Sequence, residues 1–109
     1  MLDLHPHDFA LLHQLIAGHL PPDTAVWAYG SRVNGDAHDG SDLDLVLRAA
    51  GLLELPSATL TRFREALSES NLPIFVDVHD WAQLPASFHE RILVRHEIVH
   101  SGADVAATA

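Results

Sequence analysis

The feature that most constrains this chain is a Gly-Ser pair that follows an apolar segment, in the sequence AVWAYGS. The segment before the pair predicts a buried central strand, because apolar side chains occupy both of its faces. Gly30 has no side chain, so the backbone can turn sharply there and a ligand can approach it closely. Ser31 begins a predicted helical turn whose free N–H groups can bind phosphate oxygens. The sequence therefore predicts a strand, a tight turn and a short helix suited to an anion.

Two carboxylates follow on the next predicted strand, residues 42–48, after a loop rich in Gly and Asp. Alternate residues of a strand share a face, so Asp42 and Asp44 project together while the leucines beside them face the core. Neighbouring carboxylates repel each other, and their ionised forms are costly near a core. A divalent cation bound between the two would remove this conflict. Arg32, in the preceding turn, is predicted either to reach a phosphate or to pair with an acidic residue of the loop.

A third carboxylate lies in the apolar run IFVDVH, which predicts a strand over residues 74–79. Asp77 is costly at this position unless a charged group pairs with it. An ion pair or exposure at the edge of the sheet is the alternative explanation. His79 shares the face of Asp77 and is a candidate for contact with it, although exposure at the end of the strand is the simpler interpretation.

The remaining segments predict an α+β fold, in which a small central mixed sheet is flanked by helices. Apolar residues at helical spacing predict helices over residues 8–20, 57–70 (with Ser57 as the N-cap) and 86–95. An edge strand is expected over residues 98–100, and residues 101–109 are expected to form a frayed tail. The side chains expected to face the core are Phe88, Ile92 and Leu93, and those expected to cover its edge are Leu52, Leu53 and Leu55.

The length and composition place further limits on the chain. At 109 residues, the sequence predicts one domain, residues 1–109, with a modest core. The absence of cysteine excludes disulfides and zinc sites built from thiolates. No apolar run approaches the ~20 residues of a membrane span, and the first residues lack the pattern of a signal peptide. A cytoplasmic location without a membrane partner is therefore expected.

The charge is strongly acidic, with 15 acidic residues, 6 basic residues and a net charge of -9. Such a surface should repel nucleic acid, so direct binding of nucleic acid is not expected. It suits a basic partner, or a small anionic nucleotide carried by Mg²⁺. Plain solubility is an alternative explanation of the same charge.

The order and spacing of Gly30-Ser31, Asp42, Asp44 and Asp77 resemble the motif of the DNA polymerase β-like nucleotidyltransferase superfamily. The short chain and its third strand narrow the resemblance to the minimal nucleotidyltransferases, the MntA-like antitoxins of HEPN/MNT toxin–antitoxin pairs. The resemblance covers nearly the whole chain. It implies a polymerase β-like fold and the transfer of AMP from ATP to a tyrosine hydroxyl of a small helical HEPN ribonuclease toxin.

The resemblance also implies the roles of the site residues. Asp42, Asp44 and Asp77 would bind two Mg²⁺ ions, which lie ~3.5–4 Å apart in such sites, and Asp77 would draw off the proton of the acceptor hydroxyl. Gly30-Ser31 would hold the β- and γ-phosphates of ATP. Arg32 is a further candidate for nucleotide binding.

Three functions remain open at this point. The first is an active adenylyltransferase that modifies a HEPN toxin, and the second is an antitoxin that blocks its toxin by binding alone, with a vestigial acidic site. The third is the catalytic subunit of an enzyme that modifies a small molecule such as an aminoglycoside. The intact glycine, serine and aspartate positions favour an active enzyme over a vestigial one, whereas the acidic charge does not separate a basic toxin from a cationic drug.

Overall fold

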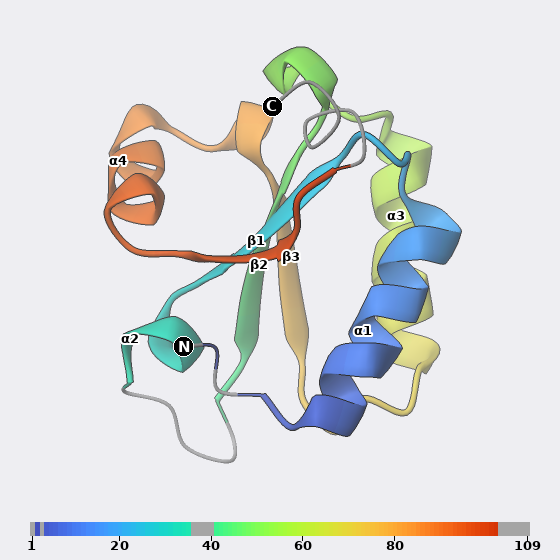
Figure 1. Ribbon diagram of the computed structural model, residues 1–109. Coiled ribbons are helices and arrows are strands. Elements are labelled where there is room, and N and C mark those ends of the chain that lie inside the picture. Colours follow the sequence, from blue (N-terminus) through green and yellow to red (C-terminus); the bar gives the residue numbers. More distant parts are fainter. Residues whose placement is uncertain (1, 3, 36–40, 103–109) are drawn as a thin grey trace.

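A four-stranded mixed sheet in the order β3-β2-β1-β4 forms the centre of the computed structural model, which describes residues 2, 4–35 and 41–102 (Figure 1). β1 runs antiparallel to both of its neighbours, and β2 runs parallel to β3. The strands are β1 (Ala25–Tyr29), β2 (Leu43–Arg48), β3 (Val76–Asp80) and β4 (Glu97–His100). The helices are α1 (Pro6–His19), α2 (Ser31–Asn34), α3 (Ser57–Glu69) and α4 (Ala86–Val94), with 3-10 turns at Ala50–Leu52 and Trp81–Gln83. The predicted α+β fold is confirmed.

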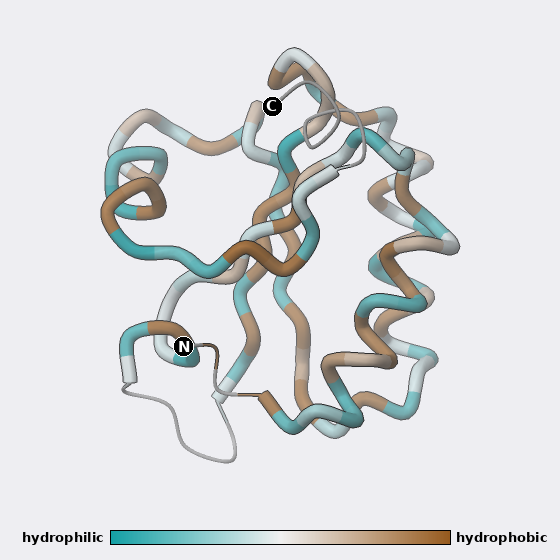
Figure 2. Tube along the Cα trace, in the orientation of Figure 1, coloured by the Kyte–Doolittle hydropathy of each residue, from teal (hydrophilic) through white to brown (hydrophobic). Residues whose placement is uncertain are grey.

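The helices cover the two faces of the sheet unequally. α1 and α3 lie side by side over one face, and α4 lies against the other (Figure 1). The main core is the layer between the sheet and the helix pair, where Leu45 packs with Leu12 and Phe63, all fully buried. Figure 2 shows apolar residues concentrated along the strands and at intervals along α1 and α3. The other face is covered only in part, which leaves room there for a site.

β1 is an interior strand with apolar side chains on both faces, as its sequence predicts. Val26 and Ala28 are fully buried in the main core. Trp27 and Tyr29 point to the other face and pack against a smaller cluster that contains Val46 of β2. Because both faces of the strand are covered, the turn that follows it at residue 30 is held in a fixed position.

The starts of two helices differ from those predicted, and α1, α3 and α4 each end one residue earlier than predicted. α1 begins at Pro6, two residues earlier than expected, because proline suits the first helical position and the ring of His5 accepts a hydrogen bond from the His7 N–H at 3.1 Å. Ser57 is wrong as an N-cap: it is the first residue of α3, and the cap position belongs to Pro56, which makes no side-chain hydrogen bond. None of the helices in the described residues is long and apolar enough to cross a membrane.

Several side chains of the connecting segments also differ from expectation. Phe88 and Leu93 were expected to be buried but are exposed, and only Ile92 of α4 is fully covered, because α4 meets the sheet along one narrow line. Of the leucines expected to cover the core edge, Leu55 is buried, whereas Leu52 and Leu53 are exposed. The predicted loop at 36–40 and the tail from 103 to 109 lie outside the described residues.

Asp80 is a buried acid at the end of β3 that the sequence reading assigned to a loop. One carboxylate oxygen accepts a hydrogen bond from the Leu55 N–H at 2.8 Å, and the other accepts one from the Ala82 N–H at 3.2 Å. The carboxylate therefore joins the connection after β2 to the turn after β3.

We expect Asp80→Ala to destabilise the protein by about 1–3 kcal/mol, because it leaves a buried N–H without an acceptor. Urea unfolding measures this loss. Glu54→Ala is the matched control, since Glu54 bonds the Gln83 side chain at the surface and its removal should cost less than about 1 kcal/mol. Equal stability of the Asp80 variant and the wild type would contradict a structural role for the carboxylate.

Candidate functional site

The turn after β1 brings the backbone of Gly30 against the side chain of Asp44. Gly30 has φ +82° and ψ −155°, and its carbonyl accepts hydrogen bonds from the N–H groups of Val33 and Asn34, which start α2. A Cβ atom at this glycine would collide with Oδ2 of Asp44 and would lie 3.2 Å from its Cγ. Only glycine combines this backbone conformation with such a close approach. The turn and the carboxylate therefore form one structural unit.

The sheet aligns Tyr29, Asp44 and Asp77 in one row across three strands. Tyr29 is paired with Asp44 between β1 and β2, and Asp44 is paired with Asp77 between β2 and β3. Residues paired across strands share a face, and this is the face that α4 covers in part. Asp42 precedes β2 and is exposed. The strand register thus brings two of the three predicted carboxylates together on adjacent strands.

The electrostatics of the row reflect this crowding. Burial raises the pKa of Asp44, the negative charges of Asp77 and Asp42 raise it further, and His79 lowers it in part. Burial, followed by the charges of Asp44 and Asp77, raises the pKa of Tyr29 to about 12. Tyr29 is therefore a neutral hydrogen-bond donor near neutral pH, and the row carries an excess of negative charge.

The donor set suits a hard divalent cation. Carboxylate oxygens are the protein ligands that Mg²⁺ prefers, and a cation beside Asp44 would offset the repulsion that raises its pKa. Within residues 2, 4–35 and 41–102, no group of three or more acidic, histidine or cysteine side chains is gathered closely enough to hold a metal ion. Two neighbouring carboxylates and an open position for substrate oxygens fit Mg²⁺, which commonly keeps few protein ligands.

His79 contacts the third predicted carboxylate. Its Nε2 atom lies 3.0 Å from Oδ2 of Asp77, and both side chains are partly exposed. The prediction that His79 shares a face with Asp77 is confirmed, and the partial exposure of His79 agrees with its position near the end of β3. The contact orients the Asp77 carboxylate relative to the His79 ring.

Arg32 is buried, with 7% of its surface exposed. Its Nε atom donates a hydrogen bond to the Ser41 carbonyl at 3.0 Å, so the side chain joins α2 to the segment that leads into β2. The predicted ion-pair alternatives, Asp36 and Asp39, lie outside the described residues. Contact between Arg32 and a phosphate stays a prediction.

Arg48 belongs to an aromatic stack that the sequence reading did not anticipate. Its guanidinium carbon lies 3.9 Å from the ring centre of Trp27 and 4.5 Å from that of Trp81. His96 stacks on Trp27 at 4.0 Å and His89 stacks on Trp81 at 3.8 Å between ring centres. Cation–π contacts of this kind favour the charged guanidinium in a partly covered position. The stack attaches α4 and the residues after it to the sheet.

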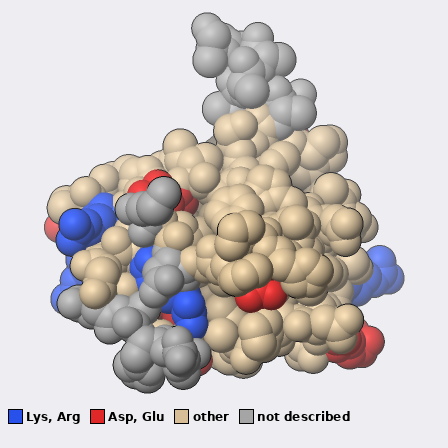
Figure 3. All heavy atoms as spheres, turned by 60° about the horizontal axis from the view of Figure 1, so that its bottom comes forward, with Lys and Arg blue, Asp and Glu red and all other residues tan. Residues whose placement is uncertain are grey.

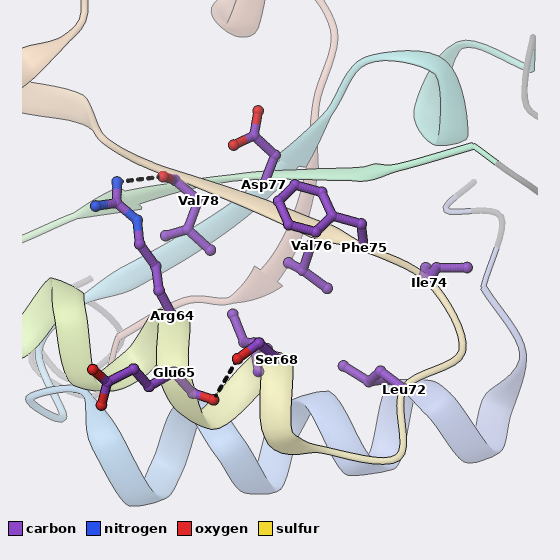
Figure 4. A pocket seen from close by; sticks show the side chains of 10 residues that line it. Arg64, Glu65, Ser68, Leu72, Ile74, Phe75, Val76, Asp77 and Val78 are labelled. Carbon is purple, nitrogen blue, oxygen red and sulfur yellow. Dashed lines mark hydrogen bonds between the residues drawn. The ribbon is translucent and has the colours of Figure 1, made fainter.

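A groove between α3 and β3 lies near Asp77 but on the other side of the strand from the row. Its volume is about 530 Å³, and Figure 4 shows Val76 and Val78 pointing toward α3 while the Asp77 carboxylate points away from them. The Arg64 side chain reaches up from α3 and donates a hydrogen bond to the Val78 carbonyl at 2.7 Å. The carboxylate therefore faces the side of the sheet that carries Asp44.

A smaller cavity, of about 280 Å³, lies on the side of the row. It is lined by Tyr29, Gly30, Asn34, Phe88, Arg91, Ile92 and Arg95, from β1, α2 and α4. Figure 3 shows this end of the molecule, where most of the visible basic groups gather on the side that carries α2 and α4. The sequence reading missed both arginines of the cavity; their spacing of four residues on one predicted helix was the available signal.

Comparisons with known proteins agree with this fold. The profile of the family described as polymerase beta, nucleotidyltransferase matches residues 16–104. The chain is 41% identical over 91 residues to the probable protein adenylyltransferase MntA of Haemophilus influenzae, a match that covers 84% of this chain and 77% of that protein.

Solved structures share the fold at lower identity. A toxin–antitoxin structure with AMP-PNP has a TM-score of 0.71 and 19% identity, and the match covers 88% of this chain and 75% of that one. The structure of a tri-AMPylated Shewanella oneidensis HEPN toxin in complex with MNT antitoxin has a TM-score of 0.67 and 15% identity, covering 94% of this chain and 76% of that one. At these identities the likeness concerns the fold.

Proposed function

The chain belongs to the polymerase beta nucleotidyltransferase family, and on that basis we propose that it transfers AMP from ATP to a hydroxyl group of a partner protein. The partner is a HEPN-type helical toxin modified on a tyrosine, and this chain is its antitoxin. The observation that carries the proposal is the position of Asp44, which lies beside Asp77 and against the backbone of Gly30. The 41% identity to a relative named as a protein adenylyltransferase supports a protein acceptor.

The proposed reaction exchanges one phosphorus–oxygen bond for another. The acceptor hydroxyl oxygen forms a bond to the α-phosphorus of ATP, and the bond from that phosphorus to the oxygen that bridges the α- and β-phosphates breaks. Pyrophosphate leaves with the electron pair of the broken bond. Asp77 receives the hydroxyl proton, and His79, 3.0 Å from its carboxylate, holds that carboxylate in orientation. A positioned carboxylate is a suitable general base for this step.

The remaining site residues hold the substrate. Gly30 and Ser31 bind the β- and γ-phosphates through the backbone and the serine hydroxyl, and Arg32 keeps the adjoining segments in place and is a candidate for phosphate contact. Asp42, Asp44 and Asp77 would hold Mg²⁺, as two ions, and the bound metal would neutralise the phosphate charge. The neutral phenol of Tyr29, at one end of the row, donates to substrate oxygens rather than adding negative charge.

The charge of the chain supports the choice of partner. A net charge of -9 suits a basic protein surface and opposes direct binding of nucleic acid. Reaction with ATP against a cellular toxin implies a cytoplasmic location, which we propose for this protein.

The test is to incubate the purified protein with ATP, Mg²⁺ and the proposed partner, a HEPN-type helical toxin. Intact-mass spectrometry of that partner should show a gain of one or more adenylyl groups. The variant with Asp42→Ala and Asp44→Ala is the control and should add no adenylyl group to the partner. A wild type that adds no group, together with full inhibition of the toxin by the double variant, would contradict the proposal and favour an antitoxin that acts by binding alone.

A further inference from the structure

We propose that the cavity between α2 and α4 binds the β- and γ-phosphates of the nucleotide, and then the pyrophosphate product, through Arg91 and Arg95. The inference deepens the proposed nucleotidyl transfer and rests on it for the identity of the ligand. It assigns to α4 the role of a phosphate-binding wall opposite Gly30.

The position of the cavity places it beside the reacting groups. Gly30 lines it, and the same glycine lies against the carboxylate of Asp44. Tyr29, which is paired with Asp44 in the sheet, lines it as well. A nucleotide whose α-phosphate lies near Asp44 would therefore extend its next two phosphates past the glycine turn and toward α4.

The charge of the lining differs from that of the chain. Among the residues that the structure describes, the cavity is lined by two arginines and no acidic residue, although the chain has 15 acidic and only 6 basic residues. Arg91 lies on α4, and Arg95 follows the last residue of that helix with an extended backbone. Both side chains are exposed, and both residues line the cavity. Within the described residues, neither has a carboxylate within ion-pair distance. Two guanidinium groups without carboxylate partners suit phosphate oxygens, which they can bind in bidentate fashion.

The size and the other donors of the cavity also suit a phosphate chain. Its volume of about 280 Å³ is below that of pockets that enclose a whole drug-sized ligand, which measure roughly 300–1,000 Å³. Asn34 contributes an amide and Tyr29 a phenol to the lining. The cavity thus offers hydrogen-bond donors to an anion, and the nucleoside would lie outside it.

Arg91 and Arg95 are positioning residues in the reaction. When the bond between the α-phosphorus and the bridging oxygen breaks, negative charge grows on the pyrophosphate group, and the two guanidinium groups stabilise that charge. The same contacts hold the triphosphate in line before the step. They also retain pyrophosphate afterwards, which makes pyrophosphate an inhibitor that competes with ATP.

The experiment measures binding directly, by isothermal titration calorimetry, without turnover. The full chain is titrated in Mg²⁺ buffer with α,β-methylene-ATP, with inorganic pyrophosphate and with AMP. Arg91→Ala/Arg95→Ala should bind the analogue and pyrophosphate about tenfold more weakly for each arginine removed, and AMP as the wild type does. Arg91→Lys/Arg95→Lys should recover part of the loss, because it keeps the charge. Arg62→Ala is the matched control, since Arg62 is exposed on α3, over the opposite face of the sheet.

The outcomes separate this inference from the proposed function. Unchanged pyrophosphate affinity in the double alanine variant overturns the inference, even if the wild type transfers AMP to its partner. Equal losses for AMP and pyrophosphate also overturn it, because they indicate a nucleoside contact or a damaged fold. A wild type that binds pyrophosphate through the arginines but adds no AMP to the partner supports the phosphate site and contradicts the proposed acceptor. If AMP binds too weakly to measure, pyrophosphate alone decides.

Discussion

Asp44→Asn should abolish AMP transfer and at the same time make the metal-free protein more stable. The carboxylate that this substitution removes is a proposed metal ligand. Losing it should remove several kcal/mol of charge stabilisation from the transition state, which lowers the rate roughly a thousandfold or more. The gain in stability follows from the pKa of Asp44, which burial and the charges of Asp77 and Asp42 raise. A charged group that prefers its neutral form in the fold destabilises the fold when it ionises.

The pH dependence gives the sign of this effect. Because the folded-state pKa of Asp44 lies above its ordinary value of 3.8, the wild type in EDTA should lose stability relative to the variant as the pH rises from that value through the folded pKa. The two unfolding temperatures should converge at acidic pH and separate near neutral pH. Transfer is followed by the mass of the partner protein, and stability by thermal unfolding at several pH values.

Glu69→Gln is the matched control for Asp44→Asn, since Glu69 is exposed at the end of α3 and takes no part in the row. Glu69→Gln should change neither AMP transfer nor the pH dependence of the unfolding temperature. Asp77→Asn should lose transfer as well, and turnover retained in that variant would remove Asp77 from the mechanism. An Asp44 variant that is active, or less stable than the wild type at neutral pH in EDTA, would contradict the site described here.

Gly30→Ala should lose both transfer and stability. The backbone at this glycine, with φ +82° and ψ −155°, is in a region that other residues occupy at a cost of about 1–3 kcal/mol. The added Cβ would also collide with Oδ2 of Asp44, so either the turn or the carboxylate must move. Movement of the carboxylate by a fraction of an ångström is enough to disturb a site that depends on fixed geometry.

Gly35→Ala separates these two effects. Gly35 also has a positive φ, +85°, but its ψ of 6° lies in the left-handed helical region, and no atom of the described residues lies within 4 Å of its hypothetical Cβ. Gly35→Ala should lower the free energy of unfolding by only about 1 kcal/mol and should retain AMP transfer. Urea unfolding and the partner-mass assay measure both variants. Full transfer by Gly30→Ala would show that the close approach to Asp44 has no role.

Sequence patterns could predict the parts of this protein that depend on local geometry. The alternation of apolar and acidic residues in β2 predicted that Asp44 lies on the face away from the core, and the alternation in β3 predicted that His79 shares the face of Asp77. The strand register now pairs Asp44 with Asp77. The apolar residues on both faces of β1 predicted its interior position. The roles of Asp42, Asp44 and Asp77 in binding metal stay predictions.

Contacts between distant segments could not be predicted in the same way. The buried carboxylate of Asp80 bonds the backbone of Leu55, and nothing in the local sequence of either segment indicates that partner. The exposure of Phe88 depends on how narrowly α4 meets the sheet, which periodicity does not reveal. The proximity of Arg91 to Gly30 likewise depends on the tertiary placement of α4.

The stack around Arg48 gives the protein an intrinsic optical signal. Both tryptophans of the chain, Trp27 and Trp81, belong to it, and each has a histidine ring against its face. Since His89 lies on α4, and His96 follows that helix, any displacement of the wall that carries the arginines alters the surroundings of the indole rings. Tryptophan emission, excited without a label, should therefore respond when nucleotide draws that helix toward the sheet or releases it.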